Sequence, residues 1–434
     1  HRAAADSLLA RAAAVLRTQR RVRENYHMID DEIQFPVLVA RWLGDPRVPD
    51  DRKRAFLLER EPGAPATRLA LLAKALALVA GQAMPYARDP SATNLRGFAR
   101  LDSARWRSSS WRDSDAGYAN GRFAMDVNVV WMPLALRSMG DILSALDRLG
   151  LVRAGAGDVV TLAGTAAAPD STLPGTLLSR FIRFPDSLRR AHRTWAGSVR
   201  HFVVALGPEQ VRSRVRGRLA TLPAAERHYW ERVVATTRAD RDSLVFLALS
   251  LDASGRPIGV ASTDVGMRML LATAPMPPDS AARADVLRDF DVLMRPFPVG
   301  LFVDTLGPVV ANDAYAPAAV WSRFERDRYH SPRVVWGREV NVIEMALAAA
   351  IEQALDASGV LRAGVPASYV ATLRSALERT RRAVRASGFA EAELWSYRIE
   401  GRRLRPTRFG SASDVQLWNT TSLAVEYLLD QIRR

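Results

Sequence analysis

The stretch from Trp111 to Trp131, WRDSDAGYANGRFAMDVNVVW, concentrates polar and aromatic side chains within 21 residues. It holds three aspartates, two arginines, two asparagines and three large aromatic rings: Asp113, Asp115, Asp126, Arg112, Arg122, Asn120, Asn128, Trp111, Tyr118 and Trp131. A loop that only connects two helices does not need this set, whereas binding and catalytic residues concentrate on loops held by a rigid scaffold. Carboxylates beside aromatic faces and planar donors are what a sugar site requires. The stretch therefore indicates a carbohydrate-active enzyme.

Glycoside hydrolysis ordinarily uses two carboxyl groups, one protonated and one ionised, on either side of the scissile bond. Asp113 or Asp115 is the candidate acid in this stretch; the alternative is that both stabilise a turn before Gly117. The same spacing is reminiscent of a calcium loop, but no acid stands at its closing position, so no metal site is predicted. Asn128 could line the site or cap the next helix. Candidate substrate-binding residues here are Trp111, Arg112, Asp115, Arg122, Asp126 and Asn128.

Two further clusters join tryptophan to a carboxylate or an amide. Residues 329–339 read YHSPRVVWGRE, in which Trp336 and Glu339 share one face of a helix start. Glu339 is a candidate catalytic carboxylate, although an acid in a first helical turn can serve the helix dipole alone. Residues 391–397 read EAELWSY, and Glu391 and Glu393 are either catalytic or solvated surface charge. Candidate substrate contacts in the two clusters and in the following segment 416–418 are Tyr329, His330, Trp336, Trp395, Gln416 and Trp418.

The amino-acid composition limits which classes of protein this chain can belong to. The chain has 434 residues, 48% hydrophobic and 25% charged, which is globular, and no linker divides it, so we expect a single domain over residues 1–434. The absence of cysteine excludes disulfides, thiolate catalysis and Cys-ligated zinc. No window reaches about 18 uncharged apolar residues, so no membrane span is expected. The chain begins at His1, which a cleaved signal peptide or a deliberate truncation would explain; we expect a periplasmic or secreted protein, with the cytoplasm left open.

The net charge of +15 comes almost entirely from arginine, since Lys53 and Lys74 are the only lysines. Such a charge can indicate nucleic-acid binding. However, the arginines are scattered over the chain, often three or four residues from an acid, and no basic face interleaved with aromatics is visible. General replacement of lysine by arginine explains the charge better, so no nucleic-acid partner is predicted, whereas an anionic polysaccharide stays open.

The hydrophobic pattern predicts a mainly α fold. Helices are expected over residues 4–25, 37–43, 52–61, 66–84, 129–149, 186–206, 219–238, 281–293, 333–355, 366–386 and 415–433. A short strand is expected over 158–163, and β-hairpins over 244–261 and 391–405. No βαβ rhythm and no glycine-rich phosphate loop is present. Antiparallel helix pairs over this length suit an α/α toroid with its site built from loops at one end.

Several segments of the sequence resemble those of a known enzyme family. The segments YHSPRVVWGREVN, ELWSYRI and FGSASDVQLWNTTSLAVEYLL resemble the second half of the six-hairpin, (α/α)6-barrel glycosidases, most closely the glycogen-debranching and glucoamylase-like group. WRDSDAGYANGR resembles the segment in which that group carries its general acid. The resemblance implies Asp113 as acid and Glu393 as base, with Glu391 behind it, an inverting reaction and no cofactor. ELWSY stands where the group has a proline-preceded glutamate, so Glu339 competes for the base role.

Together these observations predict an inverting, exo-acting glycosidase acting on an α-glucoside or a related oligosaccharide. Tryptophans 111, 336, 395 and 418 would offer stacking faces, and Arg112, Arg122, Asn128 and Gln416 would bind hydroxyl groups. One alternative is a polysaccharide lyase on the same toroid, with Tyr329 and His330 transferring protons beside Asn128 and Arg338. Another is a non-catalytic glycan-binding protein. The oligomeric state is left open.

Overall fold

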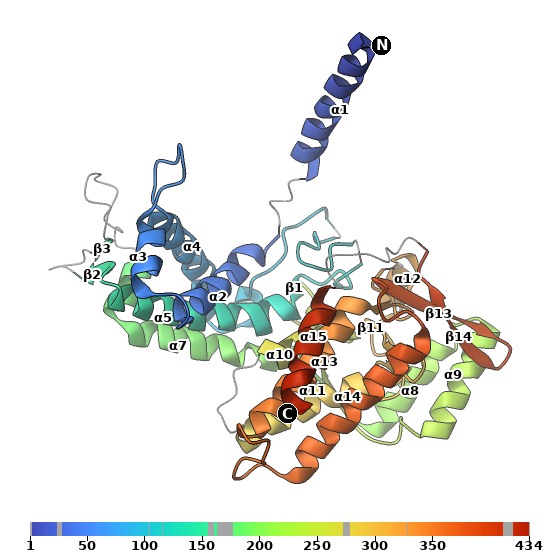
Figure 1. Cartoon of the computed structure of the whole chain (residues 1–434). Helices are drawn as coiled ribbons and strands as arrows, with labels where there is room; N and C mark the ends of the chain where they lie inside the picture. The colour runs from blue at the N-terminus through green and yellow to red at the C-terminus, as the bar shows by residue number, and fades with distance from the viewer. Residues whose placement is uncertain are drawn as a thin grey trace.

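The computed structural model describes residues 2–23, 28–103, 105–114, 116–154, 160–162, 177–271, 278–327, 329–410 and 420–433. This part of the chain is mainly helical with a few short antiparallel strands, which confirms the mainly α prediction (Figure 1). The helices are α1 (Arg2–Arg23), α2 (Asp31–Gly44), α3 (Asp50–Leu58), α4 (Arg68–Arg88), α5 (Met132–Arg148), α6 (Leu177–Arg183), α7 (Pro185–Ala196), α8 (Pro208–Leu219), α9 (Ala224–Thr237), α10 (Asp264–Leu271), α11 (Ser280–Met294), α12 (Ala318–Arg326), α13 (Gly337–Ala354), α14 (Ala367–Ser387) and α15 (Thr421–Arg433). Shorter helical turns are η1 (Ala92–Asn94), η2 (Asp126–Trp131, a π-helix running into α5) and η4 (Gly197–His201).

The strands are short and pair antiparallel. They are β1 (Phe123–Ala124), β2 (Val152–Ala154), β3 (Val160–Leu162), β4 (Val203–Leu206), β5 (Leu244–Leu247), β6 (Ser250–Leu251), β7 (Pro257–Ile258), β8 (Ala261–Ser262), β9 (Phe302–Val303), β10 (Gly307–Pro308), β11 (Ala311–Asn312), β12 (Val335–Trp336), β13 (Leu394–Glu400) and β14 (Arg403–Arg408). The largest sheets have three strands, in the orders β1-β6-β7 and β12-β13-β14.

The helices pack against one another in a connected series. Helix α2 packs on α5, η2 on α10, α10 on α13, and α13 on α15, so these helices follow one another side by side. Helix α4 packs on α2, α5 and α7, and α7 packs on α5, while α11 packs on α10 and α14 on α13. The sequence agrees with these contacts: α13 buries every residue from Val342 to Ala348, as a helix covered on several sides must, whereas α14 buries a single stripe at helical spacing.

The contact between α10 and α13 depends on a glycine. A Cβ atom added at Gly266 would lie 2.8 Å from Cγ1 of Ile343. The absence of a side chain at this position lets the two helices approach closely, which brings their first turns to the same end of the molecule.

Several local predictions were wrong. Helix α2 begins at Asp31, six residues before the predicted start, because Pro36 is accommodated inside the helix. Residues 203–206 form a strand rather than the end of a helix, since Val203–Leu206 pairs with Leu244–Leu247. That pairing also breaks the predicted 244–261 hairpin: only its turn is kept, between β6 and β7. Residues 335–336 form a strand before α13. The 391–405 hairpin is confirmed, with its turn at residues 401–402.

Two helical stretches, Arg68–Arg88 and Asp126–Arg148, are long and apolar enough to cross a membrane by length and composition. Of their most apolar windows, 44% and 61% respectively is buried inside the protein. Core helices of soluble proteins pass the same test, so this property alone does not make either one a membrane span.

Candidate active site

The stretch from Trp111 to Trp131 lies near the first turns of several helices. Asp30 immediately precedes α2, Asp126 begins η2, Asp264 begins α10, and Glu339 lies in the first turn of α13. All four acids are at most 2% exposed. A carboxylate near a helix N-terminus is favoured by the helix dipole and by the free backbone N–H groups. The fold therefore gathers acids from distant parts of the sequence around one loop, residues 110–121.

Tight backbone packing shapes this loop. A side chain at Gly117 would collide with the carbonyl oxygen of Arg112, and one at Gly121 would collide with Ser250. Ala119 and Asn120 take left-handed backbone conformations with φ of 55° and 58°. The two glycines are thus places of close backbone approach, which keep the loop folded against the helix ends.

Arg112 forms the electrostatic centre of the loop. Its side chain is 0% exposed and pairs with Asp264, with Nε 3.1 Å from Oδ2, and its Nη2 donates to the carbonyl oxygen of Val310 at 3.1 Å. The guanidinium also lies over the ring of Trp111, 4.3 Å from its centroid. A group enclosed in this way cannot bind a sugar hydroxyl directly, so its role is to neutralise Asp264 and support Trp111.

A second part of the network joins two carboxylates through a serine. The hydroxyl of Ser110 lies 2.8 Å from Oδ2 of Asp30 and 3.3 Å from Oδ2 of Asp126, and Tyr118 donates to the same Asp126 oxygen at 2.9 Å. Burial, together with the charges of Asp264 and Asp30, raises the pKa of Asp126 to about 8. Asp126 therefore carries a proton at neutral pH and acts as an internal structural acid.

Glu339 is 2% exposed and therefore out of reach of a ligand. It accepts from the Thr263 hydroxyl at 3.0 Å and pairs with Arg338 at 2.7 Å. Its burial raises its pKa, although the charge of Arg338 opposes this. The guanidinium of Arg338 lies 5.1 Å from the Trp111 ring centroid, so Glu339 helps to position the cation that covers one side of that ring.

Three aromatic rings meet above this network. Trp111 makes edge contacts with His330 and Trp336, with ring centroids 5.8 and 5.7 Å apart, and His330 stacks on Trp336 at 5.4 Å. The indole N–H of Trp336 donates to the carbonyl oxygen of Tyr329 at 2.7 Å. Trp111 is half-buried, whereas the Tyr329 residue is 44% exposed. The predicted first and second clusters are thus one aromatic assembly.

His330 is fixed by two side chains on one of its nitrogens. Its Nδ1 lies 2.8 Å from the Ser114 hydroxyl and 3.4 Å from Asp327, and Ser114 also donates to Asp327. Burial lowers the pKa of His330, so the ring is neutral near pH 7. Burial raises the pKa of Asp327, but hydrogen bonds from His330 and Ser114 outweigh it and leave the pKa below its ordinary value. Because Ser114 and Asp327 share one nitrogen, this is no nucleophile–base–acid relay.

The predicted catalytic carboxylates belong to segments that adjoin this assembly. Asp113 is exposed, and its charge acts on His330. The carbonyl oxygen of Glu393 accepts from the backbone N–H of Gly337 at 2.8 Å, and the next residue, Leu394, pairs with Trp336 in the β12-β13 ladder. Glu393 is half-buried and Glu391 is exposed. The fold thus brings the third cluster beside the other two.

Other predicted contacts lie in the core. Trp395 is 0% exposed, and its indole N–H donates to the carbonyl oxygen of Leu306 at 3.0 Å, so it presents no face for stacking. Asn128 is also 0% exposed and hydrogen-bonds both backbone groups of Arg96 and the carbonyl oxygen of Ala124. Arg122 lies over Trp106, 5.0 Å from its centroid. Asp115, Gln416 and Trp418 lie outside the described residues.

Sequence reasoning missed the partners that complete the network: Asp30, Ser110, Ser114, Thr263, Asp264 and Asp327. The pair Thr263–Asp264 before an apolar run is a helix-start signal that could have drawn attention to it. In the described part of the chain, no group of three or more His, Asp or Glu side chains is arranged to hold a metal ion.

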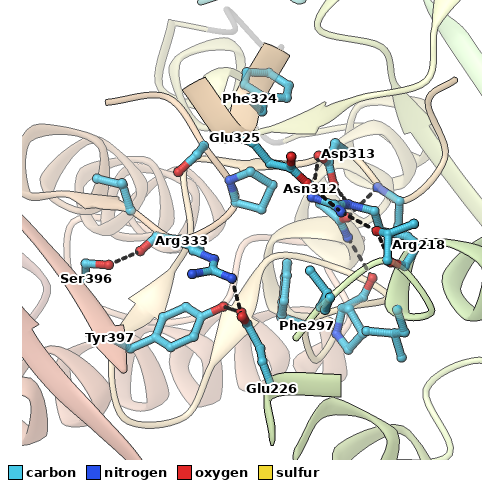
Figure 2. A pocket seen from close by; sticks show the side chains of 18 of the residues that line it. Arg218, Glu226, Phe297, Asn312, Asp313, Phe324, Glu325, Arg333, Ser396 and Tyr397 are labelled. Atoms are coloured by element: carbon cyan, nitrogen blue, oxygen red, sulfur yellow. Dashed lines mark hydrogen bonds and ion pairs between the residues drawn. The ribbon is translucent and has the colours of Figure 1, made fainter. Parts of the chain in front are cut away.

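A pocket of about 600 Å³ is lined in part by the segment between His330 and Trp336 (Figure 2). It is bounded by the α8–α9 connection, α12, residues 331–334, β13 and Phe409. Figure 2 shows Arg333 and Tyr397 both reaching Glu226 on one side and Arg218 reaching Asp313 on the other. Among the residues that the structure describes, none of the side chains predicted as site residues lines this pocket.

Comparison of the chain with protein-family models, with curated proteins and with solved structures finds no match.

Proposed function

We propose that the protein is a glycoside hydrolase of the inverting type, with Asp113 as general acid and Glu393 as general base. The observation that carries the proposal is the meeting of three sequence-distant segments at one aromatic assembly: the segment of Asp113 contributes Trp111, and the segment of Glu393 pairs through its backbone with that of Trp336. Glycoside hydrolysis uses two carboxyl groups, one on each side of the scissile bond. Glu391 is the second choice for the base.

The buried network supports this division of roles. Glu339 is engaged by Thr263 and Arg338 and is 2% exposed, so it serves Trp111 rather than a substrate water. Arg112 and Arg338 lie against the ring of half-buried Trp111, so we propose that the sugar packs at Tyr329, which is 44% exposed, rather than on a face of Trp111. Exo action on an α-glucoside rests on the likeness of the sequence motifs to glucoamylase-like enzymes.

We further propose that the side-by-side helices α2, α5, α10, α13 and α15 belong to the inner ring of an (α/α)6 toroid, with α4, α7, α11 and α14 in the outer layer. The gathering of acid-bearing helix N-termini at one end supports this arrangement, because that end is where a toroid carries its site.

The test is hydrolysis of maltotriose by the full chain and by Asp113→Asn and Glu393→Gln, followed by reducing-sugar release and by NMR of the first anomer formed. We expect kcat to fall by about 100-fold or more in each variant, since general acid–base groups contribute that much, and an α-substrate to give a β-product. Glu391→Gln is the matched control and should retain activity. Full activity of Asp113→Asn overturns the assignment, and an ultraviolet-absorbing product from a uronate polymer favours the lyase.

A further inference from the structure

The wall of the pocket in Figure 2 contains two ion pairs, and both partners of each pair line the pocket. Arg218 binds Asp313 through two nitrogens, Nε to Oδ1 at 2.8 Å and Nη2 to Oδ2 at 3.2 Å. The Glu226 carboxylate accepts from Tyr397 through one oxygen, at 2.9 Å, and from Arg333 through the other. Both arginines are therefore already neutralised by carboxylates of the pocket wall, and neither is an unpaired cation for an anionic ligand.

Donors nevertheless face the pocket. The side chain of Arg333 is 48% exposed, and only its Nη2 binds Glu226. Within the described part of the chain, its Nε and Nη1 have no hydrogen-bond partner. A guanidinium held in place by a carboxylate presents its remaining N–H groups in a fixed plane, where they can donate hydrogen bonds to ligand oxygens, hydroxyl groups included.

Apolar surface completes the pocket. Half-buried Phe409 lines it beside the buried rings of Phe297 and Phe324 and the side chains of Leu219 and Leu222. Ring carbons of a sugar carry C–H groups that pack on such surface, while its hydroxyl groups need the planar donors. The volume of about 600 Å³ lies within the range of small-ligand sites, roughly 300–1,000 Å³.

From the closed ion pairs, the free donors of Arg333 and the aromatic lining, we propose that this pocket is a second glycan-binding site. Its ligand is a neutral, polyhydroxylated molecule of mono- or disaccharide size. The proposal does not depend on hydrolysis at Asp113, because it concerns side chains that the catalytic assignment does not use.

The pocket can be tested by titrating the full chain with maltose, using Asp113→Asn as the background so that no turnover occurs. Arg333→Gln removes the donors, and we expect it to weaken the pocket affinity by about tenfold, the effect of losing roughly one good charged hydrogen bond. Arg333→Gln also removes the cation that pairs with Glu226. Phe409→Ala is therefore a second variant, which changes the pocket and leaves both ion pairs intact. Arg398→Gln is the matched control: Arg398 is the next residue along β13 from Tyr397, is exposed and does not line the pocket.

Three results bear on the proposal. Maltose binding that is weakened by Arg333→Gln and Phe409→Ala, but unchanged in Arg398→Gln, supports it. Binding that survives both pocket variants and is lost in Trp111→Ala overturns it, while leaving the catalytic assignment standing. Tighter binding of a galacturonic-acid or glucosamine disaccharide than of maltose overturns the neutral ligand class.

Discussion

At the scale of single residues, Ser110 places one hydroxyl group between two buried carboxylates. One hydrogen cannot satisfy both Asp30 and Asp126, which lie 2.8 and 3.3 Å from its oxygen. The arrangement is stable because Asp126 keeps its own proton, as its pKa of about 8 requires. Stability of the whole chain is therefore linked to this proton.

Asp126→Asn should make the unfolding free energy less dependent on pH. Between the ordinary aspartate pKa of 3.8 and about 8, the folded chain holds a proton that the unfolded chain has released. The wild-type free energy of unfolding consequently falls as pH rises through this window, by up to about 1.4 kcal/mol per pH unit for one proton. The amide keeps the acceptor oxygen and cannot ionise, so urea titrations across the window should show a shallower slope.

Asp51→Asn is the control for that experiment, because Asp51 is exposed in the first turn of α3. It should reproduce the wild-type slope. If Asp126→Asn and wild type have the same slope, Asp126 is ionised in the folded chain and the reasoning about Ser110 fails.

Arg112→Leu should be strongly destabilising. The substitution leaves Asp264 buried at 1% exposure without its cation, and breaking a buried pair in this way costs about 3–5 kcal/mol. Chemical denaturation measures the loss. Arg189→Leu removes a pair whose members are 64% and 72% exposed and should leave the unfolding midpoint unchanged. Equal effects from the two substitutions would contradict the assigned importance of the buried pair.

The sequence identified Trp111, Arg112 and Asp126 because they lie in one dense stretch. It could not identify Asp264, which is 152 residues from Arg112. Nor could it distinguish Trp336 beside Trp111 from Trp395 in the core, since both follow apolar residues in similar surroundings. The local sequence pattern shows which polar and aromatic side chains lie near one another along the chain. Which buried charges form pairs depends on how distant elements pack together.

At the scale of elements, two glycines in helices should respond with opposite sign to replacement by alanine. Gly266→Ala would drive a methyl group against Ile343 where α10 crosses α13, and overpacking of this kind costs about 1–3 kcal/mol. Gly217→Ala lies in α8 with no atom within 4 Å of the new carbon, and should stabilise the chain by about 0.5–1 kcal/mol through helix propensity. Thermal unfolding of both variants checks the pair; stabilisation by Gly266→Ala would contradict the close approach.

Long helices such as α4, α11 and α14 were predictable because the spacing of their apolar residues repeats over several turns. The strand at Val203–Leu206 was not, because four apolar residues after a helix continue a helical pattern equally well and their partner, Leu244–Leu247, lies far along the chain. The same non-local pairing explains the failed hairpin. The 391–405 hairpin succeeded because its two strands are neighbours joined by a glycine turn.

At the scale of the whole molecule, helix α1 stands apart from the rest (Figure 1). None of its side chains from residue 5 to 15 is buried, and Leu8 and Leu9 are each 67% exposed. The buried apolar core runs instead from Ile29 to Leu429. Removing residues 1–27 should therefore leave the thermal unfolding midpoint within about a degree of the full chain, because surface changes usually alter stability by less than roughly 0.5 kcal/mol. A large drop in the midpoint would show that α1 belongs to the core.

The segment 329–336 contributes side chains both to the aromatic assembly at Trp111 and to the pocket. His330 and Trp336 contact Trp111, while residues 331–334 between them line the pocket. A ligand in the pocket that restrains this segment changes the free energy of binding at the Trp111 assembly. A ligand at the Trp111 assembly does the same for the pocket, and thermodynamic linkage makes the two effects equal in size. Maltose in the pocket and a glucan at Trp111 would then report on each other, so that each alters the dissociation constant of the other by one common factor.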